Sequence, residues 1–169
     1  ECTALTDCLT GQFQEKAPLL DADRVCASCA TGYFCPGGTV SPAACLAGSH
    51  TVSSGKSKCT PCPVGHMKAA DGAGKCISCT AGYAQDKQGQ KSCEPCPAGR
   101  YQEIAGQRTC NACVALACNA GSEHVECGSN TRGRCAACNL GHAKRIAGTH
   151  GCAACAAGQF QNQTGQIKC

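Results

Sequence analysis

Residues 62–110 read CPVGHMKAADGAGKC-IS-CTAGYAQDKQGQKSC-EP-CPAGRYQEIAGQRTC, which is one pattern written three times. Each unit opens and closes on a cysteine, and the units follow one another every 17 residues. One glycine comes three residues after the opening cysteine, and a second comes four residues before the closing one. A fixed period of cysteines and glycines indicates a tandem array of small structural repeats.

The pattern continues on both sides of this stretch, and seven Cys-x-x-Cys pairs mark its joints: Cys26/Cys29, Cys59/Cys62, Cys76/Cys79, Cys93/Cys96, Cys110/Cys113, Cys135/Cys138 and Cys152/Cys155. The two glycines keep phase, as in Gly48 and Gly55 or Gly158 and Gly165. Glycine supplies the positive φ that a tight turn needs. Each unit is therefore predicted to be a short, irregular β-hairpin with its second glycine in the turn. No helical period of apolar residues is visible, so almost no helix is expected.

The same phase predicts the disulfides. The opening cysteine of a unit lies 14 residues before the closing one, and a hairpin brings those two ends together. A bond within one Cys-x-x-Cys would close a small, strained ring. The predicted bonds are Cys45–Cys59, Cys62–Cys76, Cys79–Cys93, Cys96–Cys110, Cys138–Cys152 and Cys155–Cys169. Each should stabilise the fold by about 3 kcal/mol in the chain-entropy description.

The composition requires such covalent bonds. The 169 residues include three Phe, three Tyr, one Met and no Trp, so large apolar side chains cannot offset the entropy of ordering the chain. Twenty-one cysteines place the chain among disulfide scaffolds, which persist in oxidising compartments. We expect an extracellular or cell-surface protein with a small disulfide-rich fold, in which irregular short β-hairpins form an elongated tandem-repeat rod with almost no helix.

Certain short motifs resemble known families. Cys-Pro-Ala-Gly-Arg-Tyr at 96–101 and Cys-Ala-Thr-Gly-Tyr-Phe-Cys-Pro-Gly-Gly at 29–38 resemble ephrin-receptor-like cysteine-rich repeats of the growth-factor-receptor group. The stretch 96–135 is also similar to a tumour-necrosis-factor-receptor cysteine-rich module. That resemblance implies the bonds Cys96–Cys110, Cys113–Cys127 and Cys118–Cys135. It transfers no binding residue, because the ligand-contacting loops of those receptors have no fixed motif.

These patterns predict four regions: irregular N-terminal cysteine-rich modules at 1–44, four 17-residue repeats at 45–112, an inserted crossed-disulfide module at 113–137 and two 17-residue repeats at 138–169. In the first region we expect Cys8–Cys26 and a small Cys29–Cys35 loop, although Cys29 could instead reach Cys45. Cys2 is then left over and should pair upstream, in a longer protein of which this chain is a segment.

Zinc is the main alternative to disulfides, because Cys-x-x-Cys pairs about 14 residues apart approach zinc-ribbon spacing. Seven overlapping pairs with phased glycines favour disulfides, so no metal and no other cofactor is expected. The histidines are interpreted as exposed strand residues; they are His50, His66, His124, His142 and His150. No nucleophile has a plausible partner set, so the chain should not be an enzyme and no catalytic residue is predicted.

The charge argues against nucleic acid as a partner. A net charge of +4 comes from single basic residues without runs, such as Lys56, Lys68 and Lys75, and these are interpreted as solvated. Asn162-Gln163-Thr164 is an N-glycosylation sequon that we expect to be occupied. The variant Asn111-Ala112-Cys113 should stay bare, because its cysteine is expected to be oxidised.

Two functions fit these features. Uniform, Ala-rich 17-residue arrays resemble algal or protist surface and flagellar-hair (mastigoneme) glycoproteins, which implies a filament. The alternative is the stalk or ligand-binding part of a receptor ectodomain. In either case the expected partner is protein, itself or a neighbouring surface chain, or glycan, with no small-molecule substrate. Aromatic rings recur near one repeat position and should either pack on their own hairpins or form a lateral contact strip; they are Tyr33, Phe34, Tyr83, Tyr101 and Phe160.

Overall fold

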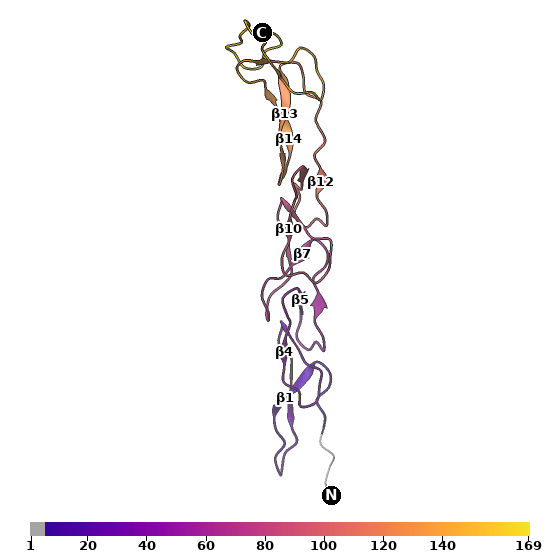
Figure 1. Cartoon of the computed structure of the whole chain (residues 1–169). Helices are drawn as coiled ribbons and strands as arrows, with labels where there is room; N and C mark the ends of the chain where they lie inside the picture. Colours follow the sequence, from indigo (N-terminus) through magenta and orange to yellow (C-terminus); the bar gives the residue numbers. More distant parts are fainter. Residues whose placement is uncertain (1–5) are drawn as a thin grey trace. The chain divides into compact units, whose positions relative to one another are not determined.

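A computed structural model describes residues 6–169, and these residues contain sixteen short strands and no helix (Figure 1). The strands form eight two-stranded sheets, each made of strands that are consecutive in sequence. No helix in this part of the chain could cross a membrane. The strands are β1 (Gln12–Lys16), β2 (Val25–Ser28), β3 (Tyr33–Phe34), β4 (Ala43–Ala44), β5 (Ser49–His50), β6 (Thr60–Pro61), β7 (His66–Met67), β8 (Ile77–Ser78), β9 (Tyr83–Ala84), β10 (Glu94–Pro95), β11 (Arg100–Tyr101), β12 (Asn111–Ala112), β13 (Ser122–Gly128), β14 (Thr131–Ala137), β15 (His142–Ala143) and β16 (Ala153–Ala154).

The hairpin of each repeat joins the two residues after the first glycine to the two residues between units. In β7–β8, His66 pairs with Ser78 and Met67 pairs with Ile77, in antiparallel register. The pairing stops after two residues because the next amide, that of Lys68, donates to the carbonyl of Gln90 in the following repeat, at 3.2 Å. The prediction of short hairpins is confirmed. The second glycine, such as Gly72, lies with positive φ in the long loop that connects the two strands.

Ten disulfides hold these hairpins, and Cα atoms in each pair lie 5.5–5.9 Å apart, the ordinary separation for such a bond. All six pairs of the 14-residue rule are present, and Cys29 bonds Cys35 rather than Cys45. The crossed bonds Cys113–Cys127 and Cys118–Cys135 follow the pattern implied by the receptor-module resemblance. Cys2 lies outside the described residues. The ten bonds are Cys8–Cys26, Cys29–Cys35, Cys45–Cys59, Cys62–Cys76, Cys79–Cys93, Cys96–Cys110, Cys113–Cys127, Cys118–Cys135, Cys138–Cys152 and Cys155–Cys169.

Sulfur takes the place of a hydrocarbon core. The fully buried side chains of the described residues are seven cysteines and one lysine: Cys29, Cys35, Cys45, Cys62, Cys79, Cys118, Cys138 and Lys144. Every opening cysteine from Cys45 to Cys79 belongs to this set, whereas its closing partner is half-buried. The disulfides therefore supply both the cross-links and most of the interior.

The described chain divides into two compact units. The first holds the residues up to Cys79 together with Gln85–Glu94 and Gly106–Arg108. The second holds Thr80–Ala84, Pro95–Ala105 and Thr109–Cys169. The same repeat-to-repeat contacts occur inside each unit.

Candidate functional site: the repeat joints and the exposed surface

Neighbouring repeats are joined by backbone hydrogen bonds from both glycines. In the first compact unit of the chain, the amide of Gly48 donates to the carbonyl of Lys68 at 2.8 Å, and the amide of Gly72 donates to the carbonyl of Cys45 at 2.8 Å. The second unit repeats both bonds, for example Gly141 to Gln161 at 2.9 Å and Gly165 to Cys138 at 2.9 Å. Each repeat is thus attached to the next at two fixed points.

The first glycine also permits a close approach two repeats away. A Cβ atom on Gly65 would collide with the carbonyl oxygen of Gly106, and one on Gly48 would collide with that of Gly89. Gly121 stands in the same relation to Gly165 in the second unit. These glycines have φ between 74° and 83°, a conformation that also disfavours a side chain. Glycine is therefore required at this position for space as well as for backbone geometry.

A single repeat position carries all the buried polar side chains of the described residues. It lies three residues after the first glycine, and its side chains are at most 5% exposed: Thr51, Lys68, Gln85, Gln102 and Lys144. The interpretation of Lys68 as a solvated residue is wrong, because its side chain is buried at this position. The signal was available, because a polar residue stands at this phase in every 17-residue repeat. Phase marks the position as constrained but does not reveal that it is buried.

The two glutamines of this set fasten the loop of their own repeat. Gln85 donates from Nε2 to the carbonyl of Ser92 at 2.9 Å and accepts from the amide of Lys87 at 3.1 Å. Gln102 makes the same two bonds, to Thr109 at 2.9 Å and from Ile104 at 3.1 Å. Buried amides require such partners, so each glutamine fixes the path of the loop that contains the second glycine.

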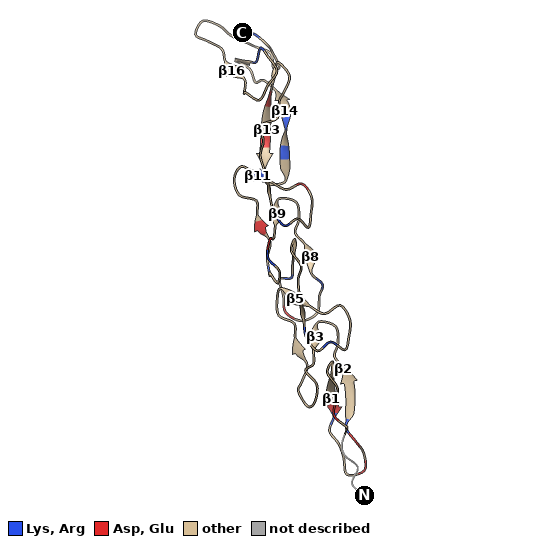
Figure 2. Cartoon of the chain, turned by 90° about the vertical axis from the view of Figure 1, so that its right-hand side faces the viewer, with Lys and Arg blue, Asp and Glu red and all other residues tan. Residues whose placement is uncertain are grey.

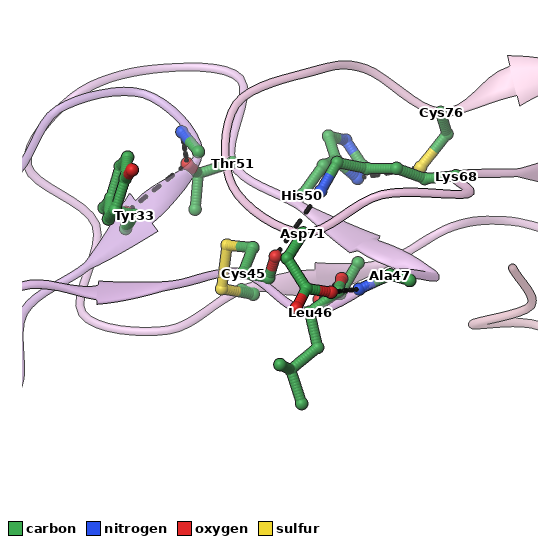
Figure 3. The surroundings of a disulfide bond; sticks show 12 residues. Tyr33, Cys45, Leu46, Ala47, His50, Thr51, Lys68, Asp71 and Cys76 are labelled. Carbon is green, nitrogen blue, oxygen red and sulfur yellow. Dashed lines mark hydrogen bonds between the residues drawn. A yellow bond between two sulfur atoms is a disulfide. The ribbon is translucent and has the colours of Figure 1, made fainter.

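The two lysines reach back to the preceding repeat instead. Lys68 Nζ donates to the carbonyl of Cys45 at 3.4 Å (Figure 3). Lys144 Nζ donates to the carbonyl of Cys118 at 3.3 Å and to that of Gly148 at 2.8 Å. Their ammonium groups are satisfied by backbone carbonyls at the joint rather than by carboxylates. Lysine at this position adds a side-chain bond to the preceding repeat or module, and Lys144 adds a second bond within its own repeat, whereas each glutamine bonds only within its own repeat.

The inserted module is built differently, around the long hairpin β13–β14. Carboxylates attach it to both flanking repeats: Glu103 accepts from the amide of Arg132 at 3.0 Å, and Glu123 accepts from the amide of Cys152 at 2.9 Å. Basic residues lie on β14 and acidic residues on β13 (Figure 2). Arg134 forms two hydrogen bonds to Glu126, which lower the pKa of that carboxyl and raise the pKa of the guanidinium.

The histidines occupy several environments. His66 and His142, which share a repeat position, are half-buried and each places Nδ1 3.1 Å from the carbonyl two residues earlier. His50 lies beside a disulfide, with Nδ1 3.0 Å from Cys76 Sγ (Figure 3). The ligand atoms of His50, Cys62 and Cys76 lie within 4.8 Å of one another. Because metals bind the thiolate and both sulfurs are joined as a disulfide, this oxidised cluster is not a ready metal site.

The aromatic rings of the predicted strip differ in exposure. Phe34 and Tyr101 are half-buried, whereas Tyr33, Tyr83 and Phe160 are exposed at 37%, 42% and 78%. Packing on the hairpin therefore accounts for part of the set, and Phe160 is left as a free apolar surface.

Both predicted modification positions lie on the surface. Asn162 is exposed, as are Gln163 and Thr164 of its sequon, so the prediction of a glycan there stays open. Asn111 is also exposed, on β12, but Cys113 of its variant sequon is bonded to Cys127.

Comparison with protein families gives one match. A family described as tyrosine-protein kinase ephrin type A/B receptor-like matches residues 48–89 and 82–135. These matches cover the four regular repeats nearly completely and end at the last cysteine of the crossed module. No curated protein was found to be similar to the chain. Since the matches span more than half of the chain and ten disulfides staple it, this is an extracellular, surface or receptor-like protein that belongs to the ephrin type A/B receptor-like cysteine-rich family.

Proposed function

We propose that the chain is a non-enzymatic structural segment of a cysteine-rich repeat glycoprotein that forms a cell-surface or flagellar-hair filament. The observation that carries this proposal is the uniform joint between repeats. The same glycine hydrogen bonds and the same buried polar position recur in both units, so each added repeat advances the chain in the same way. Function then lies in spacing and in lateral contacts, as in other repeat arrays.

The lateral contact is proposed to be protein, with Phe160 as its aromatic candidate, because at 78% this ring is the most exposed of the predicted strip. Repeated weak contacts of this kind would add through avidity. Tyr101 provides the matched control, since it stands at the same repeat position but is half-buried.

Sedimentation velocity over a range of protein concentrations tests the proposal. The oxidised chain should self-associate, and Phe160→Ser should weaken association while all ten disulfides still form. Tyr101→Ser should change folding yield more than association. A chain that stays monomeric at all concentrations, and whose small-angle scattering shows a compact particle, would refute the filament.

A receptor ectodomain is the second candidate, and the β13–β14 hairpin favours it. This hairpin is the longest of the described residues, with seven residues in each strand, and it displays charged groups on a module pinned at both sides. Arg132→Glu should abolish binding to a cell-surface partner under this alternative. It should leave self-association through Phe160 unchanged.

A further inference from the structure

The contact between His50 and Cys76 has a defined hydrogen-bond direction. A disulfide sulfur carries no hydrogen, so the shared proton belongs to the imidazole, and Nδ1–H donates to Cys76 Sγ at 3.0 Å. The contact crosses a repeat joint, because His50 lies on β5 of one repeat and Cys76 closes the next. Sulfur is a weak acceptor, and a donor at this distance draws electron density from the sulfur and makes it a better electrophile.

The two sulfurs of this bond differ in access. Cys62 is 0% exposed, whereas Cys76 is half-buried and lines a groove of about 580 Å³ that is open to solvent. His50, His66 and Lys75 line the same groove, and no carboxylate does. A nucleophile can therefore approach Cys76 but not Cys62, and the groove favours an anion.

We propose that the Cys62–Cys76 disulfide is a thiol-exchange site, at which a small anionic thiol forms a mixed disulfide with Cys76 assisted by His50. The incoming thiolate attacks Cys76 Sγ, a new sulfur–sulfur bond forms there, and the bond to Cys62 breaks. The electron pair leaves with Cys62 Sγ, which takes a proton from solvent. The sulfur of Cys62 is thereby reduced to a thiol, and the incoming thiol is oxidised into the mixed disulfide.

The next repeat supplies an internal control. Cys79–Cys93 also spans 14 residues, Cys79 is 1% exposed and Cys93 is half-buried. Met67 stands there at the repeat position of His50, two residues after the first glycine. The two bonds thus share loop length and residue burial, and they differ in the histidine and in the groove that Cys76 lines. Among the ten disulfides of the described residues, Cys62–Cys76 alone has a histidine hydrogen-bonded to sulfur.

The first experiment follows the two bonds in the full oxidised chain. The chain is incubated with 3-mercaptopropionate and a chelator, so that no metal is captured by freed thiolates, and samples are quenched in acid and mapped by mass spectrometry. The adduct on Cys76 should form about tenfold faster than the adduct on Cys93, the size expected for one hydrogen bond. Equal rates at the two cysteines would overturn the proposal.

The double variant His50→Ala, Met67→His tests the histidine itself. His50→Ala should slow exchange at Cys76 to the rate at Cys93 and leave every other bond unchanged. Adding Met67→His should transfer the fast exchange to Cys93, a gain that misfolding cannot produce provided that all ten disulfides form. If exchange at Cys76 stays fast in both variants, accessibility alone explains it and His50 has no role.

The last experiment tests the preference for anions. The ratio of rates with 3-mercaptopropionate and with the cationic thiol cysteamine is measured at Cys76 and divided by the same ratio at Cys93, which cancels the intrinsic reactivity of each thiol. Lys75→Gln should lower this quotient about threefold, and high salt should lower it as well. A quotient near one in the unaltered chain would refute an anionic partner.

Discussion

The regular array at 45–110 and the inserted hairpin β13–β14 differ in what fixes their local geometry. The array uses strands of two residues, and its geometry is set by glycine contacts, buried sulfur and one buried polar position. The hairpin uses seven-residue strands, and positive φ angles occur there at non-glycine residues, Glu126 at 62° and Ser129 at 48°, as well as at Gly128 and Gly133. Spacing is therefore fixed by backbone where the sequence is periodic. Where the period is interrupted, side chains carry more of the structure and are freer to specify a contact.

Full reduction should have the largest effect, because it removes the feature that both regions share. Each 14-residue loop should lose about 3 kcal/mol of stabilisation. Circular dichroism and amide exchange should show loss of structure in the array and in the hairpin together, since an isolated hairpin is marginal in water. A chelator should leave the oxidised protein folded; unfolding by chelation would instead reveal structural metal.

Gly65→Ala and Gly99→Ala should separate the close approach inside the array from the cost of backbone geometry alone. Both glycines have φ of 74°, so both variants carry the cost of placing a side chain at positive φ, about 1–2 kcal/mol. A Cβ on Gly65 also collides with Gly106, whereas one on Gly99 meets nothing within 4 Å. Gly65→Ala should therefore be about 1–3 kcal/mol less stable than Gly99→Ala in denaturant titration. Equal losses would mean that the close approach is dispensable.

Gln85→Ala and Gln161→Ala should measure what burial adds to the same hydrogen bonds. Gln161 repeats the pattern, donating to Lys168 at 2.9 Å and accepting from Gln163 at 3.0 Å, but it is half-buried whereas Gln85 is 4% exposed. The Gln85 variant removes two part-buried hydrogen bonds together with the packing of a buried side chain, and should lose about 1–3 kcal/mol. The Gln161 variant should lose about 0.5 kcal/mol, because water replaces the amide. Thermal melts of both oxidised variants provide the comparison.

Glu126→Gln should have the smallest effect. Arg134 lowers the folded-state pKa of Glu126, so this carboxylate stabilises the fold above its unfolded pKa, and that stabilisation is lost as pH falls through the lowered folded value. The variant should flatten the acid side of the stability profile slightly and change nothing at neutral pH beyond the loss of a weak exposed ion pair. Melting temperatures measured across the acid range test this, and a large drop at neutral pH would contradict it.

The sequence predicts the cysteine pairs and short hairpins because a disulfide and a turn leave local, phased signals. The fixed spacing between Cys62 and Cys76, for example, predicts that they pair. Contacts between repeats leave no such signal: a glycine that packs on the next repeat and one that packs two repeats away show the same period. The burial of Lys68 depends on a neighbouring repeat, so its own repeat does not indicate it. The contact of His50 with Cys76 crosses a joint in the same way and could not be seen from either repeat alone.

The approach of Gly48 to Gly89 and of Gly65 to Gly106 has a consequence for cooperativity. Most linear repeat proteins are described by coupling between nearest neighbours. Here a repeat also contacts its second neighbour. Unfolding one repeat therefore disturbs contacts over five successive repeats, namely that repeat and two on each side. Such an array should melt in longer blocks than nearest-neighbour coupling allows, and a defect in one repeat should be felt beyond the repeats that touch it directly.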